Sequence, residues 1–185
     1  MSEAFWALGR ASGVVLLVLM TVTLLLGIVT RSGRPLPGLP RFAVLLSHRN
    51  LSLLSVVFLA VHVGTLLLDP YAQLTLVDLV VPFLGAASPL ALGLGTLSLD
   101  LVVAVTATAL LRRWLGRGIF RAVHWAAYAM WPMALLHGIA IGSDGRSAAF
   151  LALAAASAVA VGAASVWRLT TGFVEYRRMR TEPVS

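Results

Sequence analysis

Four histidines fall as two pairs in two separate apolar segments, and the chain has no other histidine. His48 and His62 are fourteen residues apart, and His124 and His137 are thirteen apart. Along an α-helix these spacings correspond to a rise of roughly 20 Å, so each helix would carry one histidine toward either side of a hydrocarbon core about 30 Å thick. The pattern predicts two stacked haems, each bound between two imidazoles.

Histidines inside a membrane helix are costly, so a functional role with a named partner is the first interpretation. Bis-histidine ligation uses neutral imidazoles and leaves the iron without an open position, which favours electron transfer over oxygen binding at the metal. Helical phase fits one pair better than the other. A spacing of fourteen residues brings His62 to within roughly 40° of the helix face that carries His48, but a spacing of thirteen leaves His137 roughly 140° from the face that carries His124. Pro132, between His124 and His137, can kink the helix but does not by itself close that gap.

Composition places the chain in a membrane. Of its 185 residues 59% are hydrophobic and only 11% are charged, which is too apolar for an ordinary soluble domain. The net charge of +7 sits in short connections between apolar runs, a positive-inside distribution, so we expect no nucleic-acid partner. The absence of cysteine excludes thiolate clusters, disulfides and covalent haem attachment through C-x-x-C-H, so any haem is held non-covalently.

Hydropathy predicts an all-α integral membrane protein, a bundle of five transmembrane helices near 9–29, 49–68, 91–112, 122–142 and 147–170. We expect the first to be a genuine span, because it is too long for a signal-peptide core and no clear cleavage site follows it. The connection 69–90 contains an apolar stretch too short to span. It is predicted to form a short interfacial helix over the outer mouth.

Arginines fix the predicted orientation as N-out and C-in. They concentrate in the first connection, in the connection before the fourth helix, and in a short basic cytoplasmic tail at 171–185. The second and fourth helices would then both run from cytoplasm to exterior. This places His48 level with His124 near the inner side, and His62 level with His137 near the outer side.

Other residues could contact the macrocycles. Gly64 and Gly138 lie beside the outer histidines, where a missing side chain would let a porphyrin approach the backbone. Arg49 and Arg121 lie beside the inner histidines and could pair with haem propionates or an incoming anionic flavin, or only anchor the helices. Core packing is the main expected use of the aromatic residues at these depths, Phe58, Trp125, Tyr128 and Trp131.

With H-x13-H on the second helix and H-x12-H on the fourth, in parallel orientation, the chain resembles the ferric reductase-like transmembrane domain. The segments SHRNLSLLSVVFLAVH and HWAAYAMWPMALLH carry the resemblance, which extends over nearly the whole chain. That domain is shared by ferric-chelate reductases, NADPH oxidases and the haem subunit of the bacterial methionine sulfoxide reductase system.

The resemblance implies that residues 1–185 form a single di-haem domain, in which His48 and His124 bind the inner b-type haem and His62 and His137 the outer one. It also implies outward passage of electrons. Two features depart from the family: the domain commonly has six helices, so that a partner could supply one more, and the flavin and NAD(P)H module of the large oxidases is missing.

The principal hypothesis is a multi-pass cytochrome of the cell membrane, expected in a bacterial inner membrane, that forms the transmembrane component of an oxidoreductase. We expect a cytoplasmic flavin or NAD(P)H reductase, or another donor, to supply electrons. The external acceptor could be a ferric chelate, oxygen, a quinone or a periplasmic protein. A histidine-lined metal transporter is one alternative, although the histidine-bearing helices carry no carboxylate or thiol. A non-catalytic assembly subunit with structural haem is another.

Overall fold

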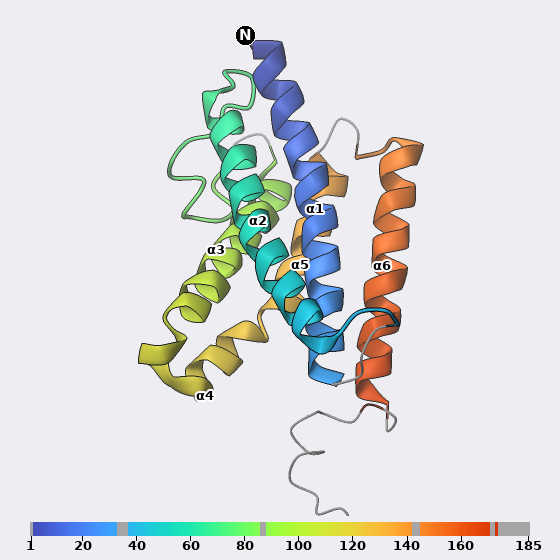
Figure 1. Cartoon of the computed structure of the whole chain (residues 1–185). Helices are drawn as coiled ribbons and strands as arrows, with labels where there is room; N and C mark the ends of the chain where they lie inside the picture. The colour runs from blue at the N-terminus through green and yellow to red at the C-terminus, as the bar shows by residue number, and fades with distance from the viewer. Residues whose placement is uncertain (1, 33–36, 86–87, 142–144, 171–172, 174–185) are drawn as a thin grey trace, which may run out of the picture.

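The structure is a computed structural model that describes residues 2–32, 37–85, 88–141, 145–170 and 173. In this part of the chain its regular elements are all helices, and it has no strand (Figure 1). The helices are α1 (Ser2–Ser32), α2 (Arg41–Leu68), α3 (Pro89–Leu110), α4 (Arg112–His124), α5 (Ala127–Ile141) and α6 (Ala148–Leu169). The all-α fold class is therefore confirmed, and the basic tail predicted at 171–185 lies outside the described residues apart from Phe173.

The long helices alternate in direction. In Figure 1 α1 descends from the N-terminus, α2 returns upward, α3 descends, α5 rises and α6 descends, while α4 lies at the lower end of the bundle. The two helices that carry histidines pointing into the bundle, α2 and α5, thus run the same way. Residues of matching depth on these two helices can face one another, as the pairing of the histidines requires.

Four helices are long and apolar enough to cross a membrane: α1, α2, α3 and α6. The fourth span, predicted over 122–142, is not continuous, because α4 ends at His124 and α5 begins at Ala127. The physical reason lies in the polarity of α4, whose arginines and exposed Trp114 suit the end of the bundle, whereas the apolar α5 enters it. With fifteen residues α5 is shorter than the other candidate spans, so the fifth crossing stays a prediction.

The interfacial helix predicted within 69–90 is wrong, because the described residues from Asp69 to Gly85 form turns and extended chain. The carboxylate of Asp78 accepts hydrogen bonds from the backbone N–H of Thr75 (2.9 Å) and from the Thr75 hydroxyl (2.7 Å), as at the first turn of a helix. No helix follows, because Pro82 has no backbone N–H for the Asp78 carbonyl and disfavours a helical conformation at Val81. Thr96 of α3 donates to the carbonyl oxygen of Asp78 at 2.6 Å. The connection is therefore tied to the side of α3 as an irregular segment.

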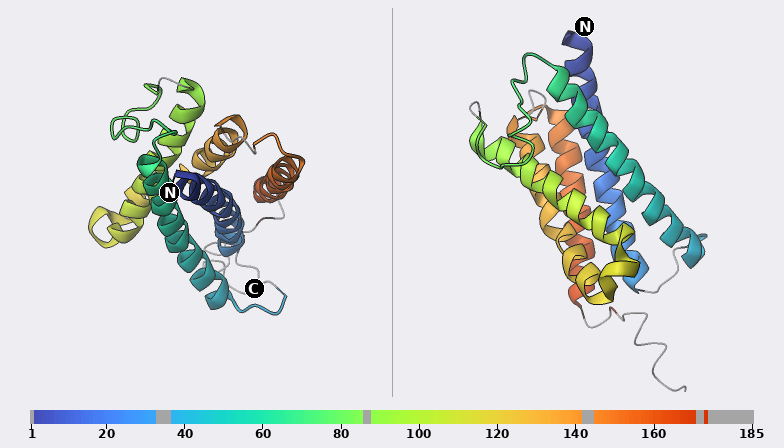
Figure 2. Two further views of the ribbon diagram at one scale, coloured as in Figure 1. Left: turned by 90° about the horizontal axis from the view of Figure 1, so that it is seen from above. Right: turned by 90° about the vertical axis from the view of Figure 1, so that its left-hand side faces the viewer.

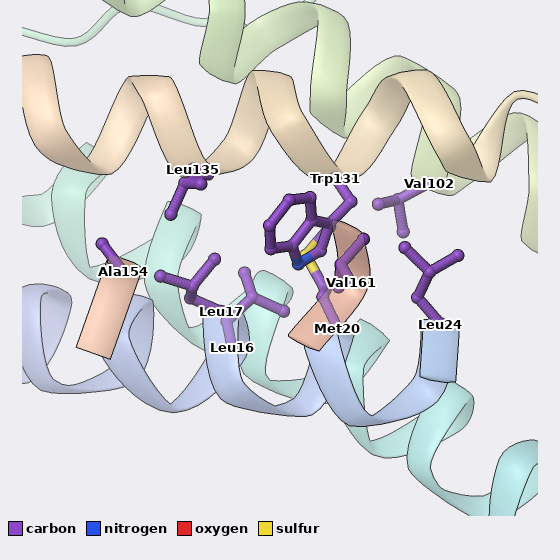
Figure 3. Packing of buried hydrophobic residues seen from close by; sticks show 9 residues of the cluster. All are labelled: Leu16, Leu17, Met20, Leu24, Val102, Trp131, Leu135, Ala154 and Val161. Atoms are coloured by element: carbon purple, nitrogen blue, oxygen red, sulfur yellow. The ribbon is translucent and has the colours of Figure 1, made fainter. Parts of the chain in front are cut away.

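The centre of the bundle is α1. Seen from above, it lies between α2 on one side and α5 and α6 on the other (Figure 2). Side chains from four helices form the apolar core around it, namely Leu16, Leu17, Met20, Leu24, Val102, Trp131, Leu135, Ala154 and Val161 (Figure 3).

Trp131 of α5 packs in this core and also makes a hydrogen bond to α1. It is 5% exposed, and its indole Nε1 donates to the hydroxyl of Thr21 on α1 at 2.9 Å. Buried indoles generally need such an acceptor. The expected use of Trp131 in core packing is confirmed, and the bond fixes the depth at which α5 lies against α1.

Candidate functional site

The structure brings His48 and His124 together, although they lie on helices far apart in the chain. Their ring centroids are 6.2 Å apart and their ring planes are inclined at 77°. His48 lies in the first third of α2, and His124 is the last residue of α4. Both rings are partly buried, so the pair sits inside the bundle near the end where α4 lies.

The phase problem of the thirteen-residue spacing is eased by the break after His124. Hydrogen bonds of the i to i−3 type run through it: Ala126 N donates to the Val123 carbonyl (2.9 Å) and Tyr128 N to the Trp125 carbonyl (3.1 Å). Each residue in such a tight turn rotates the chain by about 20° more than an α-helical residue does. This rotation moves His137 toward the face that His124 occupies, and Pro132 lies further along the same segment.

At the other level, His62 of α2 and His137 of α5 occupy the interior of the bundle. His137 lies within electrostatic reach of His62, and both rings make short contacts with neighbouring helices. The four histidines thus form two pairs at two depths in the bundle. On α2 the two depths are about 20 Å of helical rise apart. Among the described residues no group of three or more histidine, aspartate or glutamate side chains could hold a metal ion.

Three of the four imidazoles make the same kind of hydrogen bond to a backbone carbonyl of a neighbouring helix. The Nδ1 atom of His48 lies 2.9 Å from the Thr23 oxygen, that of His62 lies 2.7 Å from the Gly9 oxygen, and that of His137 lies 2.7 Å from the Ala91 oxygen. A carbonyl can only accept, so Nδ1 carries the proton in each neutral ring. The lone pair is then on Nε2, which is the tautomer that a metal-ligating histidine requires.

Each of these three rings also lies against a glycine. A Cβ atom added at Gly13 would come within 2.9 Å of His62 Cε1, one at Gly27 within 3.2 Å of His48 Cε1, and one at Gly95 within 2.6 Å of His137 Nδ1. Real Cβ atoms almost never make the closest of these contacts. A side chain at Gly13 or Gly95 would therefore displace the imidazole or its helix, and one at Gly27 would require a shift of a few tenths of an ångström.

Carbonyl and glycine follow one rule: the glycine stands four residues after the residue whose carbonyl accepts the bond. The pairs are Gly9 with Gly13, Thr23 with Gly27, and Ala91 with Gly95. In an α-helix the carbonyl of residue i points at residue i+4. A glycine at i+4 leaves that oxygen open to a second donor, and we call this combination a carbonyl seat.

Sequence reasoning did not find the carbonyl seats, although a signal for two of them exists. Gly13 and Gly27 are fourteen residues apart, like His48 and His62. Because α1 and α2 are antiparallel neighbours (Figure 1), equal spacings on the two helices place each histidine beside one glycine. The first helix was expected only to span the membrane, but it positions both histidines of α2.

The structure places the other candidate residues less distinctively. Gly64 would meet open space if it carried a Cβ atom, and Gly138 would meet the ring of Phe150 rather than a histidine. Arg49 and Arg121 have exposed side chains. Their contacts with a macrocycle stay predictions.

Two other arginines, Arg31 and Arg168, lie within electrostatic reach of His124. The guanidinium of Arg168 lies over the ring of Trp125 at 4.3 Å and donates a hydrogen bond to the hydroxyl of Tyr128. These contacts hold the Arg168 charge against the segment that follows His124. Neither arginine was a candidate from sequence, because each lies near the end of a helix where positive-inside anchoring is a sufficient explanation.

Comparison with known proteins supports a family assignment. Residues 12–135, about two thirds of the chain, match the family described as the ferric reductase like transmembrane component. The matched range contains His48, His62 and His124 and ends just before His137. No curated protein and no solved structure shows a significant match to the chain.

Proposed function

The chain belongs to the ferric reductase-like transmembrane family, and from this premise we propose that it is a b-type cytochrome with two haems. In this proposal His48 and His124 hold one haem, and His62 and His137 hold the other. The match makes the chain a membrane electron-transfer component, and domains of this family generally bind haem. We propose the number of haems, the histidines that bind them and the direction of electron transfer.

One observation carries the proposal: the pairing of His48 and His124. A bond between zinc and an imidazole nitrogen is about 2.0–2.1 Å long, so two imidazoles on opposite sides of one similar metal would have ring centroids roughly 6 Å apart. The 6.2 Å between these centroids agrees with that geometry. Two imidazoles are also a complete set for a haem iron, because the porphyrin supplies the remaining ligands.

The surroundings of the rings fit a resident haem as well. The carbonyl seats hold His48, His62 and His137 in the tautomer that offers Nε2 to a metal. Since the acceptor carbonyls and glycines belong to α1 and α3, each ring is fixed by a helix other than its own. A bis-imidazole haem would supply a one-electron couple at the iron, with no open coordination position.

The rest of the chain keeps the two levels dry and apart. The core around Trp131 and Leu17 fills the bundle between α1, α5 and α6, and α2 fixes a separation of about 20 Å along its axis. Electron transfer between such levels needs no proton transfer by the protein. The protein's task is therefore to set the distance, the orientation and the surroundings of the iron.

We place the end of the bundle that carries α4 in the cytoplasm. That end carries most of the described arginines, namely Arg31, Arg41, Arg49, Arg112, Arg113, Arg117, Arg121 and Arg168. The opposite end carries Glu3, Asp69 and Asp78. By the positive-inside rule this favours N-out and C-in, with the pair His48 and His124 nearer the cytoplasm.

Electrons would then enter from a cytoplasmic flavin or NAD(P)H reductase, or another reductant, and leave to an external acceptor. In the proposed path they pass from the level of His48 to the level of His62. A ferric chelate, oxygen, a quinone and a periplasmic protein remain the candidate acceptors, and a bacterial inner membrane is the proposed location.

The proposal is tested by purifying the full chain in detergent and recording absorption spectra before and after chemical reduction. We expect two haems per chain, with low-spin bands that sharpen on reduction. A colourless protein whose metal-transport activity is lost with the histidines would instead establish a transporter. Haem that no donor can reduce would establish a structural role in an assembly subunit.

A further inference from the structure

His124 differs from the other three histidines. Its Nδ1 atom is buried and, among the described residues, has no hydrogen-bond partner. It lies at the end of α4, directly before the break in the chain, and no glycine lies against its ring in the part of the chain that the structure describes. The inner pair thus has one carbonyl seat, and the outer pair has two.

The sequence of α3 differs in a corresponding way. Gly95 seats His137, and thirteen residues further along α3, the same number that separates the two histidines, stands Thr108 instead of glycine. The hydroxyl of Thr108 donates to the carbonyl oxygen of Ala104 at 2.8 Å. Ala104 is four residues before Thr108, so this oxygen is the one that a seat would leave open. At this spacing α3 therefore has neither a glycine nor an open carbonyl oxygen.

Positive charge adds a second difference. Arg31 and Arg168 act on His124, and the position of Arg168 is fixed by Trp125 and Tyr128, which follow His124 directly. A nearby cation favours the form of an iron centre that carries less positive charge, which is the reduced form. Both differences, the nearby arginines and the absence of a second carbonyl seat, therefore concern the site of His48 and His124.

We propose that the carbonyl seats and the inner arginines make the two haem sites unequal, with a lower reduction potential at the His62 and His137 site than at the His48 and His124 site. This rests on the proposed function, in which each pair binds a haem. A hydrogen bond from Nδ1 to a carbonyl raises the basicity of Nε2 and so stabilises ferric over ferrous iron. Two such bonds act at the outer site and one at the inner site.

The reaction in question is the addition of one electron to ferric iron to give ferrous iron, with the electron taken from an added chemical reductant. No covalent bond forms or breaks, and no proton is required. An electron entering the protein would rest on the inner level. An inside-negative membrane potential or a strong external acceptor would then draw it outward.

The direct test is a potentiometric measurement on the purified full chain containing iron protoporphyrin IX, with absorption as the readout. We expect two one-electron steps in the unaltered protein. His62→Ala should retain only the step at higher potential, and His48→Ala only the step at lower potential. The reverse assignment, or two steps at the same potential, would overturn the proposal.

Variants of the carbonyl seats test what causes the difference between the two potentials, separately from which site has the lower potential. Gly13→Ala should raise the lower-potential step and leave the other unchanged, whereas Gly27→Ala should raise the higher-potential step. Gly162→Ala on α6 is the matched control, because a Cβ atom there meets nothing within 4 Å. Arg168→Gln should lower the higher-potential step only.

The possible failures can be distinguished. If the unaltered chain binds no haem, the proposed function fails. If it binds two haems and Gly13→Ala leaves both steps unmoved while low-spin bands persist, the role of the seats is refuted. If Gly13→Ala loses the outer haem, the remaining step identifies the inner one, and a low potential for that step would overturn the proposed order.

Discussion

The imidazole rings of His48 and His124 have centroids 6.2 Å apart and planes inclined at 77°, although one ring belongs to α2 and the other to the end of α4. The two helices carry these rings to one depth because α2 and the segment from α4 to α5 enter the bundle from the same end (Figure 1). In the proposed function this pair holds one haem, and His62 and His137 hold the other. Each of the four histidines can be replaced separately.

Removal of either histidine of a pair should remove the same haem. His48→Ala and His124→Ala should each abolish the inner centre, and His62→Ala and His137→Ala should each abolish the outer one. The reason is that the haem loses one of its two bonds to the protein, so it is held more weakly, and any haem that stays bound has an open iron position and is no longer low-spin. Haem content per chain and the number of one-electron steps are the measurements.

The pairing by depth would be wrong if His48→Ala and His62→Ala lost one and the same centre. Those two residues lie on one helix, about 20 Å apart in rise, so no single macrocycle can be bound by both. Comparing these two variants is therefore the sharpest check on the assignment.

Gly95→Ala should weaken the proposed site of His62 and His137 without replacing either histidine. The added methyl group would come within 2.7 Å of His137 Cε1 and would separate the ring from the Ala91 carbonyl. When a metal-ligating histidine loses the hydrogen bond of its other ring nitrogen, metal affinity typically falls by about 10–100-fold. Competition for haem by an excess of apomyoglobin measures this loss, and Gly162→Ala should release haem at the rate of the unaltered protein.

Thr21→Val should destabilise the bundle by about 1–2 kcal/mol, because the buried indole N–H of Trp131 loses its acceptor. Thr21→Ser keeps the hydroxyl and should retain most of the stability. Thr30→Val is the matched control on the same helix, since that hydroxyl donates only to its own helix at Leu26. Reversible unfolding in mixed detergent gives the three free energies, and an equal loss for Thr21→Val and Thr30→Val would speak against the cross-helix bond.

The turn at Thr75 should loosen only in strong acid. Hydrogen bonds from the Thr75 hydroxyl and backbone N–H lower the pKa of the Asp78 carboxyl below its ordinary value of 3.8. A carboxyl with a lowered folded pKa stabilises the turn fully above its ordinary value, and the stabilisation disappears as the pH falls through the lowered value. The Thr75 amide shift in nuclear magnetic resonance should follow this transition and stay constant in Asp78→Asn. A midpoint above 3.8 would be inconsistent with these bonds.

Some elements could be predicted from sequence because they depend on local hydropathy alone. Runs of apolar residues specify α1, α2, α3 and α6, since a chain in lipid must satisfy its backbone within each helix. The break after His124 could not be predicted, because Trp125 and Ala126 have no strong helix-breaking character. It arises where the basic α4 stays at the end of the bundle and the apolar α5 enters it. The connection from Asp69 to Gly85 was misjudged because its short apolar stretch is followed by Pro82, which cannot continue a helix.

The sequence by itself determined that this is a helical membrane protein with four histidines in two pairs, and the order of its charged segments determined which ring should share a depth with which. Only the tertiary structure decided that α1 and α3 orient the rings, through Gly13, Gly27 and Gly95 and the carbonyls four residues before them. Glycine is common in membrane helices, so its meaning depends on what lies opposite. A contact between two helices is a property of their relative position, which no single segment of the chain specifies.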